Sequence, residues 1–186
     1  RDLRMSRGLG DVYKRQVYRT RTYIAADWDN DSNAVQQLNY WNDNKYFSLS
    51  FTNAHDLQQA RDSSLNCSIK RSLGERLDAS HTFVLIVGNN TKTVRSGRCQ
   101  YCNSYNSYGG YCARGYSVDN RSYIEYECEK AVRDGLKIIV LYNAFKVDRA
   151  KCPDVIRNVG IHMPMWGYGS NGQAVWNYQN VKTALG

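Results

Sequence analysis

One glutamate in the chain falls where a buried side chain is expected. The segment 121–134 has the spacing of an amphipathic helix, and Gly135 follows as its C-terminal cap. Its apolar face consists of Tyr123, Ile124, Cys128, Ala131 and Val132. At about 100° per residue, Glu127 lies inside that face. A buried carboxylate costs free energy unless it is paired or takes part in chemistry. Glu127 is therefore a candidate catalytic residue, and an ion pair with an arginine such as Arg76 is the structural alternative.

Two neighbouring glutamates have an ordinary surface explanation. Glu125 and Glu129 lie on the opposite side of the same helix, in line with Arg121 and Arg133. Charges of opposite sign at this spacing form a solvent-exposed ladder that supports the helix. We therefore expect these two carboxylates to be structural.

Three cysteines have the spacing of a metal site. Cys99, Cys102 and Cys112 form C-x2-C-x9-C within a segment rich in cysteine, glycine and tyrosine, residues 89–120. Thiolates at this spacing can wrap one tetrahedral zinc ion, which needs a fourth ligand from elsewhere. Candidates for that ligand are Cys67, Cys128, Cys152, His55 and His81. Free thiols in a reducing compartment are the alternative.

The acidic segment 27–31 does not have the pattern of an EF-hand. Its sixth position would be Ser32 instead of glycine, and its twelfth would be Leu38 instead of glutamate. Asp27 follows a predicted strand, so it is a candidate ligand-binding residue, with helix capping as the alternative.

Periodicity predicts alternating strands and helices along most of the chain. Continuous β-branched and aromatic runs, as at 82–88 and 137–143, are typical of parallel strands covered on both faces. The predicted strands are 22–26, 46–51, 82–88, 137–143 and 162–166. The predicted helices cover 34–41, 65–77, 121–134 and 175–185. This order predicts one α/β domain with a flavodoxin-like, doubly wound parallel sheet of five strands, in which the cysteine-rich insert precedes the fourth strand. Ligands bind such sheets at the carboxyl ends of the strands, here after Ala26, Phe51 and Gly88. The aromatic segment 166–178 is expected to serve packing.

Composition and charge exclude several classes of protein. Hydrophobic residues make up 42% of the 186 residues and charged residues 23%, which is ordinary globular composition. The net charge is +8, but residues 1–21 contribute seven basic and two acidic side chains to it. The body therefore carries no basic excess of the kind that binds nucleic acid. No apolar run reaches the roughly 18 residues of a membrane span, and no signal-peptide core is visible, so we expect a cytoplasmic protein.

The first sixteen residues differ from the rest. They show neither apolar periodicity nor helix caps, and residues 11–16 (DVYKRQ) resemble one reading frame of a transposon-end sequencing adapter. We therefore interpret 1–16 as an adapter-derived artefact and 17–186 as the domain. A basic arm is the alternative.

Two adjacent segments carry a resemblance to a known family. Residues 121–127 (RSYIEYE) and 135–140 (GLKIIV) are similar to the signature helix and following strand of TIR domains. In that family an aromatic residue, usually tryptophan and here Tyr123, precedes the catalytic glutamate by four positions. More narrowly, the chain resembles bacterial TIR-like proteins of the Thoeris antiphage family. Supporting segments are 54–57 (AHDL), 72–77 (SLGERL), 83–88 with Thr91 and Lys92, and 143–145 (NAF).

The resemblance implies an activity on NAD. It implies cleavage of the nicotinamide–ribose bond, with Glu127 stabilising the oxocarbenium-like transition state. It further implies a cyclic or transferred ADP-ribose signal, made for a companion effector after a phage-derived trigger is sensed. The expected substrate-binding residues are Ala26, Asp27, Trp28, Phe51 and Tyr123. Trp28 or Phe51 would stack against the pyridinium ring.

Two other functions remain open. One is a non-catalytic TIR-like interaction module that signals by self-association. The other is a nucleoside deoxyribosyltransferase-like enzyme, which also directs a buried carboxylate at an anomeric carbon. Glu127 separates catalytic from structural roles, because it should face an open cleft in an enzyme and be sealed by an ion pair in a module.

Overall fold

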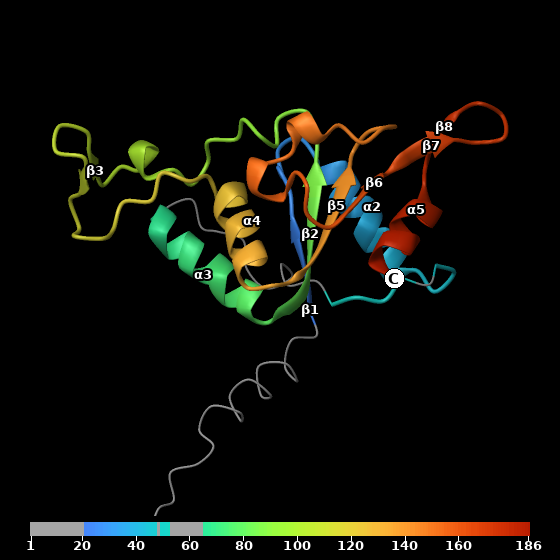
Figure 1. The fold of residues 1–186 in the computed structure, drawn as a ribbon, viewed down its shortest axis with the longest axis horizontal. Coiled ribbons are helices and arrows are strands. Elements are labelled where there is room, and N and C mark those ends of the chain that lie inside the picture. Colours follow the sequence, from blue (N-terminus) through green and yellow to red (C-terminus); the bar gives the residue numbers. More distant parts are fainter. Residues whose placement is uncertain (1–20, 48, 53–64) are drawn as a thin grey trace, which may run out of the picture.

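The computed structural model describes residues 21–47, 49–52 and 65–186, and its centre is a parallel sheet (Figure 1). Within these residues the sheet has four strands in the order β1-β2-β5-β6. The strands are β1 (Arg21–Ala25), β2 (Ser80–Val87), β5 (Lys137–Tyr142) and β6 (Ile161–Pro164). All three neighbouring pairs are parallel, and Tyr23, Phe83 and Ile138 lie side by side in register.

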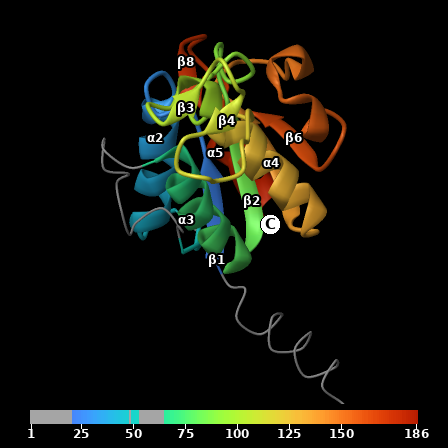
Figure 2. The same ribbon diagram turned by 90° about the vertical axis from the view of Figure 1, so that its left-hand side faces the viewer.

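Helices cover both faces of the sheet (Figures 1 and 2). One face carries α3 (Asn66–Asp78) and α4 (Tyr123–Arg133), and the other carries α2 (Ser32–Asp43) and α5 (Tyr178–Leu185). Successive strand residues point to opposite faces, so Tyr23 packs under α3 and α4 while Ile24 packs under α2 and α5. Two separate hydrophobic cores result, as the continuous apolar strands predict. None of the helices in the described part of the chain is long and apolar enough to cross a membrane.

The predicted strand at 46–51 is wrong for the residues that the structure describes there. Phe47 packs on Tyr178 of α5 with ring centroids 4.8 Å apart, and Leu49 is buried in the same core. The Phe51 amide donates to the Asn42 side chain at 2.8 Å, not to a neighbouring strand. The alternating aromatic residues thus cover the end of a helical layer instead of extending the sheet.

The other predicted strands and helices are confirmed, with shifted ends. The final helix begins at Tyr178, because residues before it form a hairpin of β7 (Trp166–Tyr168) and β8 (Ala174–Trp176). Trp166 and Trp176 stack in this hairpin with centroids 3.9 Å apart, and both pack against the core under α2 and α5. The expected packing role of this aromatic segment is therefore confirmed.

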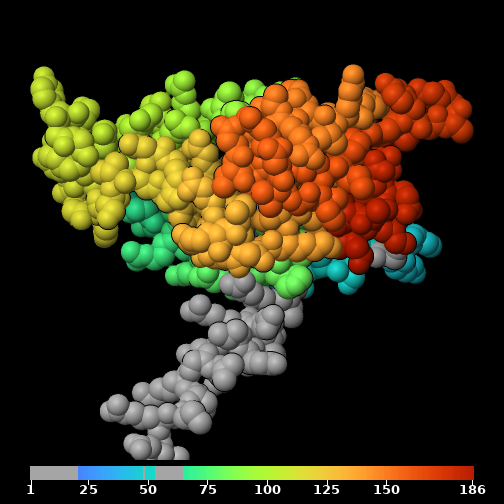
Figure 3. Space-filling model, viewed as in Figure 1, coloured from blue at the N-terminus to red at the C-terminus, as the bar shows by residue number. Residues whose placement is uncertain are grey.

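The cysteine-rich insert lies beyond the ends of α3 and α4 (Figures 2 and 3). It contains a short 3-10 turn, Cys99–Tyr101, and a two-stranded ladder of β3 (Tyr105–Asn106) and β4 (Tyr111–Cys112). Two further 3-10 turns, Arg149–Lys151 and Asp154–Ile156, connect β5 to β6. None of residues 100–120 is buried, so the insert has little hydrophobic core of its own.

Residues 1–16 lie outside the described residues, and their predicted origin gives a direct test. We expect deletion of 1–16 to leave the melting temperature unchanged, because this segment has no apolar stripe to bury. Thermal unfolding of the full and shortened chains measures it. For a chain of this size about 1 kcal/mol of stability corresponds to roughly 2–4 °C. A larger drop on deletion would show that the segment packs against the domain.

Candidate functional site

Helix α4 presents Glu127 to the sheet. A capping box starts the helix: the Ser122 hydroxyl accepts from the Glu125 amide at 3.2 Å, and the Glu125 carboxylate accepts from the Ser122 amide at 2.6 Å. The helix ends before Gly135, whose φ of 69° is the left-handed conformation that glycine adopts without strain. Between these ends Glu127 is buried, with 4% of its surface exposed, as its place on the helix predicts.

The hydrogen-bond partner of Glu127 is a phenol. The hydroxyl of Tyr23, in the middle of β1, donates a hydrogen bond to Glu127 Oε1. The Tyr23 side chain is fully buried, and its ring stacks on Phe83 at 5.9 Å between centroids. The contact joins the sheet to α4 through a neutral donor.

Burial controls the ionisation of this pair. Loss of solvation raises the pKa of Glu127 to about 7, although the Tyr23 hydrogen bond and the Arg76 charge both act to lower it. Burial beside Glu127 also raises the pKa of Tyr23 well above its usual range, so the phenol keeps its proton. Arg76 thus acts on Glu127 by charge, and near neutral pH the carboxyl group is divided between its two forms.

The neighbouring glutamates are structural, but their partners differ from the predicted ladder. The ion pairs are Arg98–Glu125 at 3.0 Å, Arg121–Glu129 at 2.5 Å and Arg133–Asp134 at 3.1 Å. Arg98 belongs to the insert, so Glu125 pairs with a residue outside its helix instead of with an arginine on the same helix. Glu129 is the more exposed of the two glutamates and has no part in the helix cap.

Asp31 joins three loops at the carboxyl ends of the strands. It occupies the N-cap position of α2, but its side chain makes no capping bond. Instead its Oδ1 accepts from the Asn143 amide at 2.9 Å, beyond β5, and it packs against Gly88, beyond β2. Its other oxygen is buried without a hydrogen bond to any described residue, and burial raises the pKa of this carboxyl group. Only the Asp-rich composition of the loop hinted at this role.

Asp27 shapes the loop after β1. Its carboxylate accepts from the Asp29 amide at 3.3 Å and from the Asn30 side chain at 2.7 Å. Trp28 follows it with 48% of its surface exposed. Asp27 therefore closes a turn that presents Trp28 at the carboxyl edge of the sheet.

The predicted substrate-binding residues do not gather around Glu127. Ala26 and Phe51 pack against the core under α2 and α5, on the opposite face of the sheet from Glu127. Tyr123 is on the same helix as Glu127, and its hydroxyl donates to Asn66 of α3 at 3.0 Å. The segment 54–57, with His55, lies outside the described residues.

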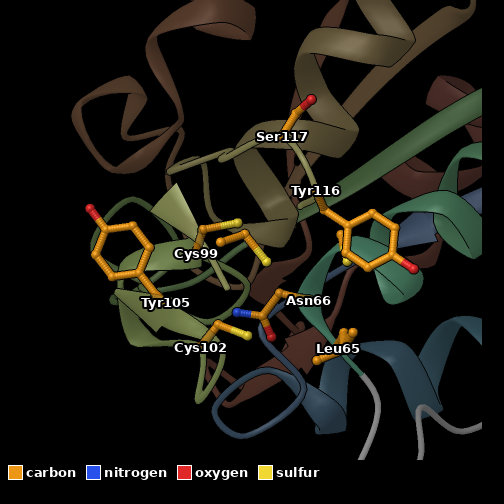
Figure 4. A pocket seen from close by; sticks show the side chains of 9 residues that line it. Leu65, Asn66, Cys99, Cys102, Tyr105, Tyr116 and Ser117 are labelled. Carbon is orange, nitrogen blue, oxygen red and sulfur yellow. The ribbon is translucent and has the colours of Figure 1, made fainter. Parts of the chain in front are cut away.

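The cysteines divide into two groups. Cys99, Cys102 and Cys112 line one small pocket, which Cys67 of α3 also lines (Figure 4). Cys128 and Cys152 are buried in the core under α3 and α4 instead. His81 is exposed and contacts its neighbour Thr82. Among the candidate fourth ligands that the structure describes, only Cys67 lines the pocket. In the described residues no three His, Cys, Asp or Glu side chains are already arranged to hold a metal ion.

Comparison with known families agrees with the resemblance. Residues 23–96 match the family described as Thoeris protein ThsB, TIR-like domain. This match supports a Thoeris-type TIR-like protein. The match to the ThsB TIR-like family begins within β1, includes α2, α3 and β2 and ends before α4, so the assignment of Glu127 depends on the helix itself. The search of curated proteins gives no match.

The contact between Asp31 and Gly88 leads to a stability prediction for this domain. In Gly88→Ala the new methyl group would lie 2.1 Å from Asp31 Oδ1, so we expect a loss of about 1–3 kcal/mol by overpacking. Chemical denaturation measures it. The same substitution made in an Asp31→Ala background should cost clearly less, and an equal cost in both backgrounds would refute the steric explanation.

The raised pKa of Glu127 predicts a pH-dependent cost. The folded state keeps a proton on Glu127 up to a pKa of about 7, against 4.5 for a solvent-exposed glutamate, so stability falls as pH rises from 4.5 to 7. Glu127→Gln removes this cost. Relative to the parent, the variant should gain little at pH 5 and up to about 3 kcal/mol at pH 8. Denaturation across this range measures it, and a difference between variant and parent that does not change with pH would contradict it.

Proposed function

We propose that this antiphage TIR-like domain cleaves the bond between nicotinamide and ribose in NAD, with Glu127 as the catalytic residue. The product would be a cyclic or transferred ADP-ribose that acts on a companion effector in the cytoplasm, after a phage-derived trigger is sensed. Support comes from the family match at 23–96 and from the glutamate on α4.

The proposed chemistry suits one carboxylate. As the bond from C1′ to the pyridinium nitrogen breaks, its electron pair leaves with nicotinamide, which departs as a neutral molecule and needs no general acid. Positive charge develops on the ribose, and the Glu127 carboxylate stabilises it electrostatically. A nucleophile within the same ADP-ribose or on an acceptor then attacks C1′ in place of water.

The observation that carries the proposal is the partner of Glu127. A fully buried glutamate bonded to a phenol is not neutralised by that contact, unlike one held in an ion pair. In a low-dielectric site the ionised carboxylate gains most when a cation forms beside it. The Tyr23 hydroxyl donates to Glu127 as a ribose hydroxyl would, so substrate entry would exchange one hydroxyl donor for another.

The burial of Glu127 also supports a second function. With 4% of its surface exposed, Glu127 is sealed from solvent by its surroundings in the described structure. A structural carboxylate of this kind fits a non-catalytic TIR-like module that signals by self-association. A deoxyribosyltransferase-like enzyme would use the same carboxylate on a deoxynucleoside.

Substitution of Glu127 tests the catalytic role. Glu127→Gln keeps the shape of the side chain and removes its charge, so we expect NAD consumption to fall by roughly 100- to 1,000-fold. Mass spectrometry of NAD and its products, with and without phage lysate, measures it. Glu129→Gln is the matched control on the same helix and should keep parental turnover.

The pH profile adds an independent check. Turnover should rise as pH increases through about 7, because only the ionised form of Glu127 stabilises the cation. Tyr23→Phe removes a hydrogen bond that lowers this pKa, so its profile should move to higher pH. If the unmutated protein consumes no NAD with phage lysate present, the module is the better explanation. Turnover of deoxynucleosides instead would favour the transferase.

A further inference from the structure

Four of the six cysteines line one pocket at the junction of the insert with α3 (Figure 4). They come from three segments: Cys67 from the first turn of α3, Cys99 and Cys102 from the 3-10 turn and the residue that follows it, and Cys112 from β4. All four are free thiols. Cys67 is one of the five candidate fourth ligands in the sequence, and the fold places it at the same pocket as the other three.

Backbone hydrogen bonds hold the three insert cysteines in one unit. The Cys102 amide donates to the Cys99 carbonyl at 2.9 Å, which closes the turn between them. The Tyr105 amide donates to the Cys102 carbonyl at 2.9 Å, and Tyr105 pairs with Cys112 across the β3–β4 ladder. This compact turn and ladder resemble the way metal-binding thiolates are presented from adjacent backbone segments.

Two features of the pocket would support cysteine sulfurs that are bound to a metal ion. The Asp119 amide donates a hydrogen bond to Cys99 Sγ at 3.3 Å, and such donors stabilise negative charge on a sulfur ligand. Cys67 lies in the first turn of α3, where the helix dipole favours an anion and where there is no acidic residue.

A crosslink would stabilise the insert. None of residues 100–120 is buried, yet the segment has a defined turn and ladder. A segment with so little buried apolar surface is commonly held by disulfides or a metal ion, and these thiols are free. Asn66, beside Cys67, donates to the Arg98 carbonyl at 3.0 Å and so already joins α3 to the residue before Cys99.

We propose that Cys67, Cys99, Cys102 and Cys112 bind one zinc ion as a structural site that fastens the insert to α3. Four thiolates satisfy the tetrahedral preference of zinc without a water ligand, so the site would be structural and not catalytic. In the described residues the thiols line the pocket without being arranged around one point, so binding of the ion would require their side chains to reorient.

Metal analysis of the full chain tests the proposal. We expect about one zinc ion per chain, and cobalt(II) added to metal-free protein should give the thiolate-to-cobalt charge-transfer absorption. In Cys67→Ala and Cys112→Ala, zinc affinity should fall by more than the roughly 10- to 100-fold that loss of an outer-sphere partner costs. Cys152→Ala, a truncation in the core outside the pocket, is the matched control and should keep the ion.

Three outcomes would overturn this assignment. They are parental protein without zinc and without the cobalt absorption, unchanged affinity in Cys67→Ala, and equal loss of zinc in Cys152→Ala. The cobalt spectrum is recorded on the parental chain, so the test does not depend on whether a variant folds. None of these measurements depends on NAD consumption.

Discussion

A parallel sheet that is covered on both faces constrains every other part of this domain. Its central strands β2 and β5 expose almost no side chain, so helices must seal both faces. Any polar group on the inner side of those helices must then find its partner on the sheet. Glu127 meets this requirement through Tyr23, which β1 places beneath α4. The same burial that makes the carboxylate costly also gives it a pKa near neutrality.

The spacing of apolar residues along the chain was enough to predict most helices and strands and which side of a helix is buried. The helical spacing around 121–134 placed Glu127 on the buried face, and continuous apolar runs predicted β2 and β5. The segment 46–51 was predicted wrongly. Alternating apolar and polar residues indicate that one side of a segment is buried, but they do not show which element buries it. Here the covering element is α5, which follows more than a hundred residues later. The contacts of Asp31 with Gly88 and Asn143 were not predicted, since they depend on the register of three strands.

The carboxyl edge of the sheet and Glu127 are two separate regions of the structure. In most α/β sheets the ligand-binding residues gather at the carboxyl edge alone. The carboxyl edge carries Asp31, Asn143 and the exposed Trp28, which fits the usual position of a ligand. Glu127 instead lies over the middle of β1, at the level of Tyr23. A substrate that used both regions would have to extend from the strand mouths along the α3–α4 side of the sheet. NAD, the substrate proposed above, is such an elongated molecule.

The insert contacts α4, the helix that carries Glu127, at the first turn of that helix. The Tyr123 hydroxyl donates to Asn66, next to Cys67, and the Tyr123 ring packs against Gly97 so closely that a methyl group there would overlap it. Lys70 of α3 donates to the Asp119 and Arg121 carbonyls at 3.1 and 2.7 Å, just before α4 begins. The start of α4 is therefore fixed by α3 and the insert together, one helical turn before Glu127. An ion that joins Cys67 to the insert would stiffen this junction, and with it the position from which Glu127 reaches Tyr23.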